Sequence, residues 1–69
     1  MYRYEIILYW SAGDGAFIAE APELPGCSAD GETQRQALEN LETVIGEWIE
    51  TAKSMGRPVP EPGGRLKFA

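Results

Sequence analysis

The 69-residue chain has no histidine and a single cysteine, Cys27. Without histidine, it offers neither a His-ligated metal site nor the imidazole base that commonly activates serine and cysteine nucleophiles. One cysteine can form neither an intrachain disulfide nor a thiolate cage for a metal. These absences exclude the usual devices by which very small proteins gain stability or catalytic groups.

Positive charge is also scarce, with 6 Lys and Arg residues against 11 Asp and Glu residues and a net charge of −5. Nucleic-acid binding depends mainly on cationic side chains that face phosphates, so this balance disfavours direct contact with DNA or RNA. The same charge suits a basic protein partner, because opposite fields speed encounter. The simpler interpretation is that the acidic residues provide solubility alone.

No apolar run approaches the roughly 20 residues that a membrane span needs. The opening residues MYRYEIILYW lack the pattern of a signal-peptide cleavage site. Together with a lone thiol, this predicts a cytoplasmic protein. We expect one domain over residues 1–69 with a small core. Because neither a disulfide nor a metal can stabilise that core, we predict a homo-oligomer, most simply a dimer.

Short alternating segments predict three strands in the first half of the chain. Aromatic and β-branched residues alternate over Tyr2–Trp10, which favours a pleated strand. The Asp-Gly turn within Ser11–Gly15 predicts a hairpin that returns as a second strand over Ala16–Ala21. The PELPG segment predicts a bend, because each proline lacks an N–H donor. Cys27–Asp30 then predicts a short third strand.

A long amphipathic helix is predicted from Thr33 to about Ser54 or Met55. Thr33 and Gln36 fit a capping box, in which each side chain accepts from the other residue's amide. Gly56 is placed to end the helix. Apolar residues recur at spacings of three and four and predict the face that packs on the sheet. They are Leu38, Leu41, Ile45, Trp48, Ala52 and Met55, widened by Ala37, Val44 and Ile49.

The predicted fold class is α+β, with a three-stranded antiparallel sheet and one long helix packed across it. Arg65–Phe68 alternates charged and apolar residues and predicts a short C-terminal strand.

The side of the helix opposite the apolar stripe is acidic. At about 100° per residue, Glu39, Glu47 and Glu50 fall on that side and Glu42 on its flank. A solvated helix face and a partner-binding surface both fit this pattern. Gly46 lies on the same side, where it is either merely tolerated or allows another backbone to approach closely.

No residue pattern predicts catalysis. Cys27 has no histidine base, and the nearby Asp30 and Glu32 would raise rather than lower a thiol pKa, so a packing role is predicted. Ser11 and Ser28 likewise lack a histidine or a Ser-x-x-Lys motif. Acidic residues on turns and strand edges could be imagined to form a magnesium site. These residues are Asp14, Glu20, Glu23 and Asp30. Acidic residues are also common at such positions because they favour solubility. We therefore predict no catalytic residue, cofactor or metal, and a hydrolase or a nucleic-acid-binding module is less favoured.

An ordered set of short motifs covers nearly the whole chain and resembles the HicB-like antitoxin family. The motifs are a hairpin, a Pro-acid-Leu and Pro-Gly-Cys bend, a Gly-x-Thr helix start, an Ala-Leu and an Asn early in the helix, Trp-Ile-Glu, a Gly and a final Pro-x-Pro. Here they are Pro22, Glu23, Leu24, Pro25, Gly26, Cys27, Gly31, Thr33, Ala37, Leu38, Asn40, Trp48, Ile49, Glu50, Gly56, Pro60 and Pro62.

This resemblance implies a partial ribonuclease H-like fold without catalysis. It also implies a partner, a small basic HicA-like toxin that has a double-stranded-RNA-binding type of fold and cleaves mRNA with a histidine. The motifs do not fix the contact residues, and we predict the acidic helix side: Glu39, Glu42, Glu47 and Glu50. Longer members add a C-terminal DNA-binding segment and repress their own operon. The residues after Gly64 are too few to form such a segment, so we do not expect this chain to regulate its own transcription by binding DNA. The alternative is an orphan self-associating module.

Overall fold

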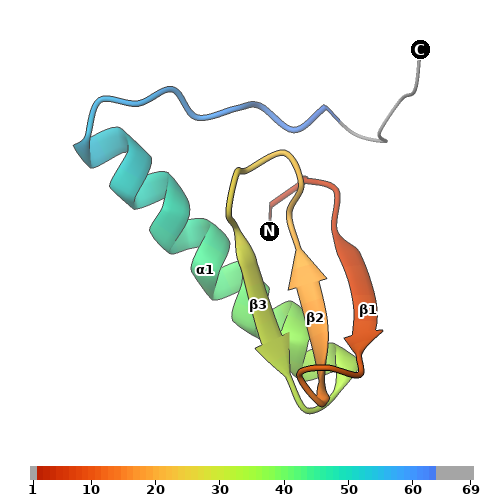
Figure 1. Cartoon of the computed structure of the whole chain (residues 1–69). Coiled ribbons are helices and arrows are strands. Elements are labelled where there is room, and N and C mark those ends of the chain that lie inside the picture. Colours follow the sequence, from red (N-terminus) through yellow and green to blue (C-terminus); the bar gives the residue numbers. More distant parts are fainter. Residues whose placement is uncertain (1, 64–69) are drawn as a thin grey trace.

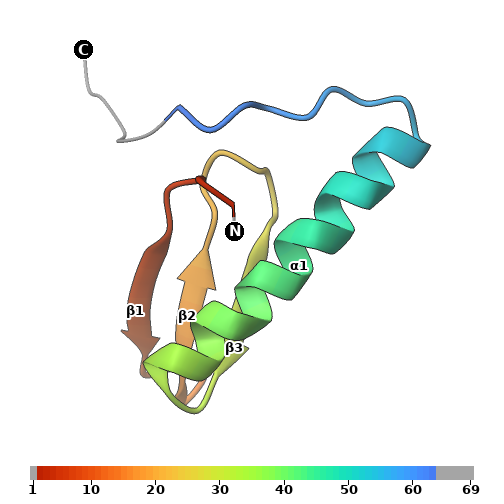
Figure 2. The ribbon, with the colours of Figure 1, turned by 180° about the vertical axis from the view of Figure 1, so that it is seen from behind.

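The computed structural model describes residues 2–63 as three strands followed by one helix (Figure 1). The elements are β1 (Ile7–Ser11), β2 (Ala16–Glu20), β3 (Ser28–Gly31) and α1 (Gln34–Ser54). The strands form one antiparallel sheet in the order β1-β2-β3. Figure 2, the view from behind, shows α1 crossing one face of this sheet. The predicted α+β fold is confirmed, while the predicted strand Arg65–Phe68 lies outside the described residues.

The register of the strands decides which side chains face the helix. Leu8 pairs with Ala19, and Trp10 pairs with Phe17. Ala19 also pairs with Ala29 on β3. Directly opposed residues share one face of a sheet, and Ala19 is fully buried while Phe17 and Ala29 pack against the core. The face that carries Leu8 and Trp10 is therefore the face on which α1 packs.

The first strand begins later than the alternation predicts, at Ile7 rather than Tyr2. The Tyr4 hydroxyl donates a hydrogen bond to the Pro60 carbonyl, and the ring of Tyr4 is buried. The Glu5 main-chain N–H donates to the Glu23 carboxylate at 3.0 Å. The segment before Ile7 thus bonds to the bend and to the C-terminal connector rather than to the sheet, and the prediction was wrong there.

The bend between β2 and β3 closes on itself through main-chain hydrogen bonds. The Ala21 N–H donates to the Cys27 carbonyl at 3.0 Å, the Leu24 N–H to Ala21, and the Cys27 N–H to Leu24. These bonds satisfy polar groups of the bend that the proline-interrupted segment cannot place in the sheet. As a result β3 starts at Ser28, one residue after the predicted position.

The predicted helix and both of its ends are confirmed, with one difference at the cap. The Thr33 hydroxyl accepts from the Gln36 N–H at 3.0 Å. The Gln36 side chain accepts from the Glu32 N–H at 2.6 Å instead of from the predicted Thr33 N–H. At the other end Gly56 has a φ of +71°, and the Arg57 N–H donates to Ala52 at 2.8 Å, which completes a Schellman turn.

The core lies between the sheet and α1, and it contains many small side chains. The largest fully buried side chains are Leu24, Leu41 and Ile45. Two residues predicted for the packing stripe are exposed: Leu38 is 36% exposed and Met55 59%. Met55 is the C-cap of α1, and Figure 1 shows that the last turns of this helix extend beyond the end of the sheet. The stripe prediction was wrong at those two positions.

Candidate functional site

Of the four predicted partner-binding residues, Glu39, Glu47 and Glu50 lie on the side of α1 turned away from the sheet and Glu42 lies on its flank; we call the four residues the acidic surface. Glu39, Glu47 and Glu50 are exposed, and Glu42 is half-buried. Glu42, Glu47 and Glu50 line a shallow hollow of about 590 Å³. Glu39 does not line it. Within residues 2–63, none of the four carboxylates is engaged in an ion pair or hydrogen bond.

Gly46 lies in the same hollow, next to the side chain of Tyr2. A Cβ added at Gly46 would lie 3.2 Å from the Tyr2 hydroxyl. The group that comes close to Gly46 is thus a side chain of the N-terminal segment rather than another backbone. The hollow therefore combines carboxylates with a phenol, and all of its polar groups can accept hydrogen bonds from a cationic partner.

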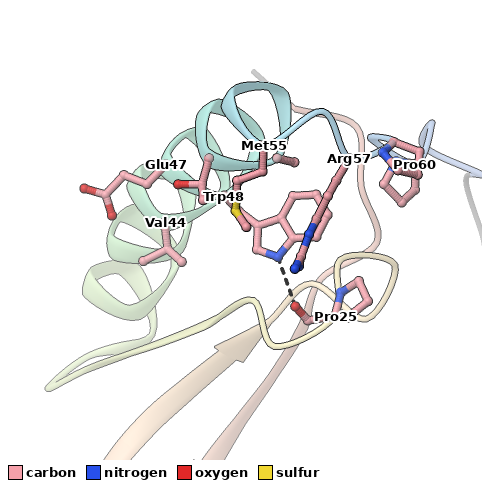
Figure 3. Close-up of a pocket in the computed structure, with 10 residues that line it drawn as sticks. Pro25, Val44, Glu47, Trp48, Met55, Arg57 and Pro60 are labelled. Carbon is pink, nitrogen blue, oxygen red and sulfur yellow. Dashed lines mark hydrogen bonds between the residues drawn. The ribbon is translucent and has the colours of Figure 1, made fainter.

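A second, apolar hollow of about 550 Å³ surrounds Trp48, and we call it the Trp48 hollow (Figure 3). The Trp48 indole N–H donates to the Pro25 carbonyl at 2.9 Å, which fixes the ring against the bend. The other lining residues are Val44, Glu47, Thr51, Ala52, Met55, Arg57, Pro58 and Pro60. The sequence analysis did not predict this hollow, because three separate segments form it. The only local signal was a tryptophan on a helix that precedes a proline-rich connector.

Cys27 lies in the core, with 3% of its surface exposed. Burial raises the pKa of the Cys27 thiol. A thiol must ionise to act as a nucleophile, so this position favours an unreactive packing residue.

The four acidic residues that could be imagined as a magnesium site do not come together. Within the described part of the chain, no group of three or more potential metal ligands is present. Asp14 accepts from the Ser11 hydroxyl at 2.8 Å in the hairpin turn. Glu23 accepts from the main-chain N–H of Glu5 at 3.0 Å and of Gly63 at 2.7 Å.

These hydrogen bonds, that of Glu5 first, lower the pKa of the Glu23 carboxyl. Glu23 therefore ties the N-terminal segment and the connector to the bend. Burial raises the pKa of the neighbouring Tyr4 phenol, and the negative charges of Glu23 and Glu61 add to this effect.

No helix within residues 2–63 is long and apolar enough to span a membrane.

Comparison with known proteins defines the class to which this small sheet-and-helix domain belongs. A family model described as UPF0150-like matches residues 3–60. The chain belongs to the UPF0150 family.

Three UPF0150 relatives agree with this assignment. The chain is 44% identical over 58 residues to the UPF0150 protein ssl0259 of Synechocystis, covering 84% of this chain and 78% of that protein. It is 36% identical over 47 residues to the UPF0150 protein Ta0767 of Thermoplasma acidophilum, covering 68% of each. It is 33% identical over 61 residues to the UPF0150 protein ssr1765 of Synechocystis, covering 88% and 76%. No solved structure gives a significant match.

Proposed function

We propose that this UPF0150 protein is a non-catalytic, cytoplasmic antitoxin of the HicB-like type. Its partner is a small basic HicA-like toxin that cleaves mRNA, and it makes no direct contact with nucleic acid. The ordered motifs that resemble the HicB-like family support this function. The observation that carries it is the acidic surface, whose carboxylates lie on the solvent side of α1 without cationic partners within residues 2–63.

Neutralisation follows from charge competition. A protein that binds RNA presents cationic side chains to the phosphates. The carboxylates of the acidic surface can bind the cationic side chains of the toxin in place of the RNA phosphates. Charge-assisted hydrogen bonds between a carboxylate and a cationic side chain are short and strong. A toxin held in this way cannot place its catalytic histidine on RNA. The net charge of −5 also speeds the encounter with a basic protein.

The experiment compares two double variants that change the net charge equally. A tagged full chain first recovers the toxin from a lysate of the source organism, and the purified toxin is then titrated calorimetrically. Glu47→Gln with Glu50→Gln removes two charges from the acidic surface. Glu32→Gln with Glu61→Gln removes two charges from exposed positions outside it.

We expect the first pair to raise the Kd for the toxin about tenfold or more, because charge pairs at an interface couple by about 1.5 kcal/mol upward. The second pair should stay close to the unmodified protein. Equal losses in both pairs would place the toxin elsewhere and leave only a net-charge effect. Failure to recover any small basic partner would remove the antitoxin function.

The second candidate is an orphan module whose only partner is another copy of itself. It is favoured by the four exposed apolar side chains of β1. Self-association by itself is compatible with the antitoxin function, since the acidic surface and β1 are different parts of the molecule, whereas the orphan status is not.

A further inference from the structure

Strand β1 exposes four large apolar side chains in succession. Ile7 is 41% exposed, Leu8 38%, Tyr9 44% and Trp10 54%. Successive side chains of a strand point to opposite faces, so the apolar surface continues on both faces of the sheet along β1. A small soluble domain rarely leaves such a contiguous patch uncovered unless it is an interaction surface.

The same strand is at the edge of the sheet. All five of its residues pair with β2 on one side. On its other side no strand of residues 2–63 pairs with it, as Figure 1 shows. Natural edge strands are usually protected by a lysine, a proline, a bulge or an inward charge. The sequence ILYWS of β1 contains no charged residue and no proline, so nothing in the strand itself prevents a further strand from pairing with it.

Helix α1 does not cover this edge, because it packs mainly on β3 and β2. Leu8 and Trp10 face the helix side of the sheet, yet both stay exposed. The Trp10 ring is nevertheless held in place by an edge-to-face contact with Phe17, with centroids 5.0 Å apart. The Trp10 part of the apolar surface is thus held in place before any partner binds, which lowers the entropy cost of binding.

We propose that two copies of this chain pair antiparallel through β1, so that the three strands of each copy join into one continuous sheet. A two-fold axis perpendicular to the sheet at Tyr9, the middle residue of β1, lets all five residues of the strand pair. Tyr9 then lies opposite Tyr9 of the partner subunit, and Leu8 opposite the partner's Trp10. Ile7 lies opposite the partner's Ser11. Both helices lie on the same face, and every residue of β1 takes part.

The absence of charged residues on β1 suits a second copy as the occupant of this edge. Two chains of net charge −5 repel each other, and an uncharged contact surface minimises that repulsion. Strand β1 provides such a surface, and its own sequence is apolar enough to complement itself. A basic partner is better matched to the acidic surface on the solvent side of α1. This inference concerns self-association and holds whether or not a toxin is bound.

The test measures the mass of the full chain in solution by sedimentation at about 100 µM. We expect a species of twice the 7.6 kDa chain mass. Tyr9→Lys should be a folded monomer, because like charges directly opposite each other destabilise a strand pair. Tyr9→Glu should also be monomeric. Mixing the two variants should restore a dimer, because residue 9 faces itself across the axis.

A second pair of variants tests the register even where the charged variants fail to fold. Tyr9→Cys should give a covalent dimer on mild oxidation, since opposed residues in antiparallel strands lie within disulfide reach. Glu39→Cys, on the acidic surface, is the matched control and should not crosslink in this way. A monomeric unmodified chain, or a dimer that persists in Tyr9→Lys, would overturn the proposal. A chain that stays monomeric alone, and whose β1 pairs with the toxin once the toxin is added, would show that a second copy is the wrong occupant of this edge.

Discussion

Glu23 accepts a hydrogen bond from the main-chain N–H of Gly63, 40 residues further along the chain, at 2.7 Å. The other oxygen of the same carboxylate accepts from Glu5. One side chain in the bend therefore holds both the segment before β1 and the connector after α1. In a domain whose buried residues include many alanines, such hydrogen bonds between segments help to hold the segment before β1 and the connector after α1 in place.

The first prediction concerns acid stability. The pKa of Glu23 is lowered in the folded protein by its hydrogen bonds from Glu5 and Gly63. Its stabilising effect is therefore fully present above the pKa of an ordinary glutamate and is lost as the pH falls through the lowered value. Urea unfolding measured across the acidic range should show a smaller loss of stability in Glu23→Gln than in the unmodified chain. Glu39→Gln is the control and should respond to acid as the unmodified chain does. If Glu23→Gln also lost as much stability in acid as the unmodified chain, the hydrogen bonds to Glu23 would not be stabilising.

The second prediction concerns the approach of β3 to α1. A Cβ at Gly31 would lie 2.4 Å from the Ala37 main-chain nitrogen, so one of the two segments has to move. Gly31→Ala should lower the free energy of unfolding by about 1–3 kcal/mol, as overpacking does. Gly13→Ala is the matched control, because a Cβ there meets nothing within 4 Å and its φ is not positive. Equal stability of the two variants in chemical denaturation would show that no close approach exists.

The third prediction concerns the contact between Trp48 and Pro25. Trp48→Phe keeps an aromatic ring but removes the N–H that donates to the Pro25 carbonyl. The expected loss of stability is about 1 kcal/mol, the usual net value of one such hydrogen bond. Trp48→Leu should cost more, because the ring that lines the Trp48 hollow is lost as well. A Trp48→Phe variant as stable as the unmodified protein would mean that the indole N–H contributes nothing.

A fourth prediction separates the two surfaces proposed for binding. Glu47→Gln with Glu50→Gln should weaken toxin binding and leave the sedimentation mass of the free chain unchanged. Tyr9→Lys should abolish the dimer and weaken toxin binding much less, because β1 is outside the acidic surface. Titration calorimetry and sedimentation on the same preparations measure both effects. A joint loss of both properties in either variant would mean that one surface serves both purposes.

Local signals in the sequence were enough for the helix and its acidic surface. The hydroxyl of Thr33 and the positive φ of Gly56 act on their own helix ends, so their effect could be predicted from a few neighbouring residues. The phase of the glutamates follows from the helix geometry alone.

Features that depend on distant segments could not be predicted in this way. The start of β1 depends on Tyr4, whose hydroxyl bonds to Pro60 56 residues away. The Trp48 hollow likewise needs Pro25 and Pro60 to meet the end of the helix. Alternation predicted a strand over β1 but could not show that α1 would leave its apolar side chains exposed.

Inhibition of mRNA cleavage tests the antitoxin function most directly. The purified toxin partner is incubated with RNA while the full chain is added in increasing amounts, with Glu47→Gln/Glu50→Gln and Glu32→Gln/Glu61→Gln in parallel. We expect cleavage to fall to background near equimolar chain, and to require an excess only for the Glu47 and Glu50 pair. Cleavage that continues at full rate while the complex forms would contradict neutralisation.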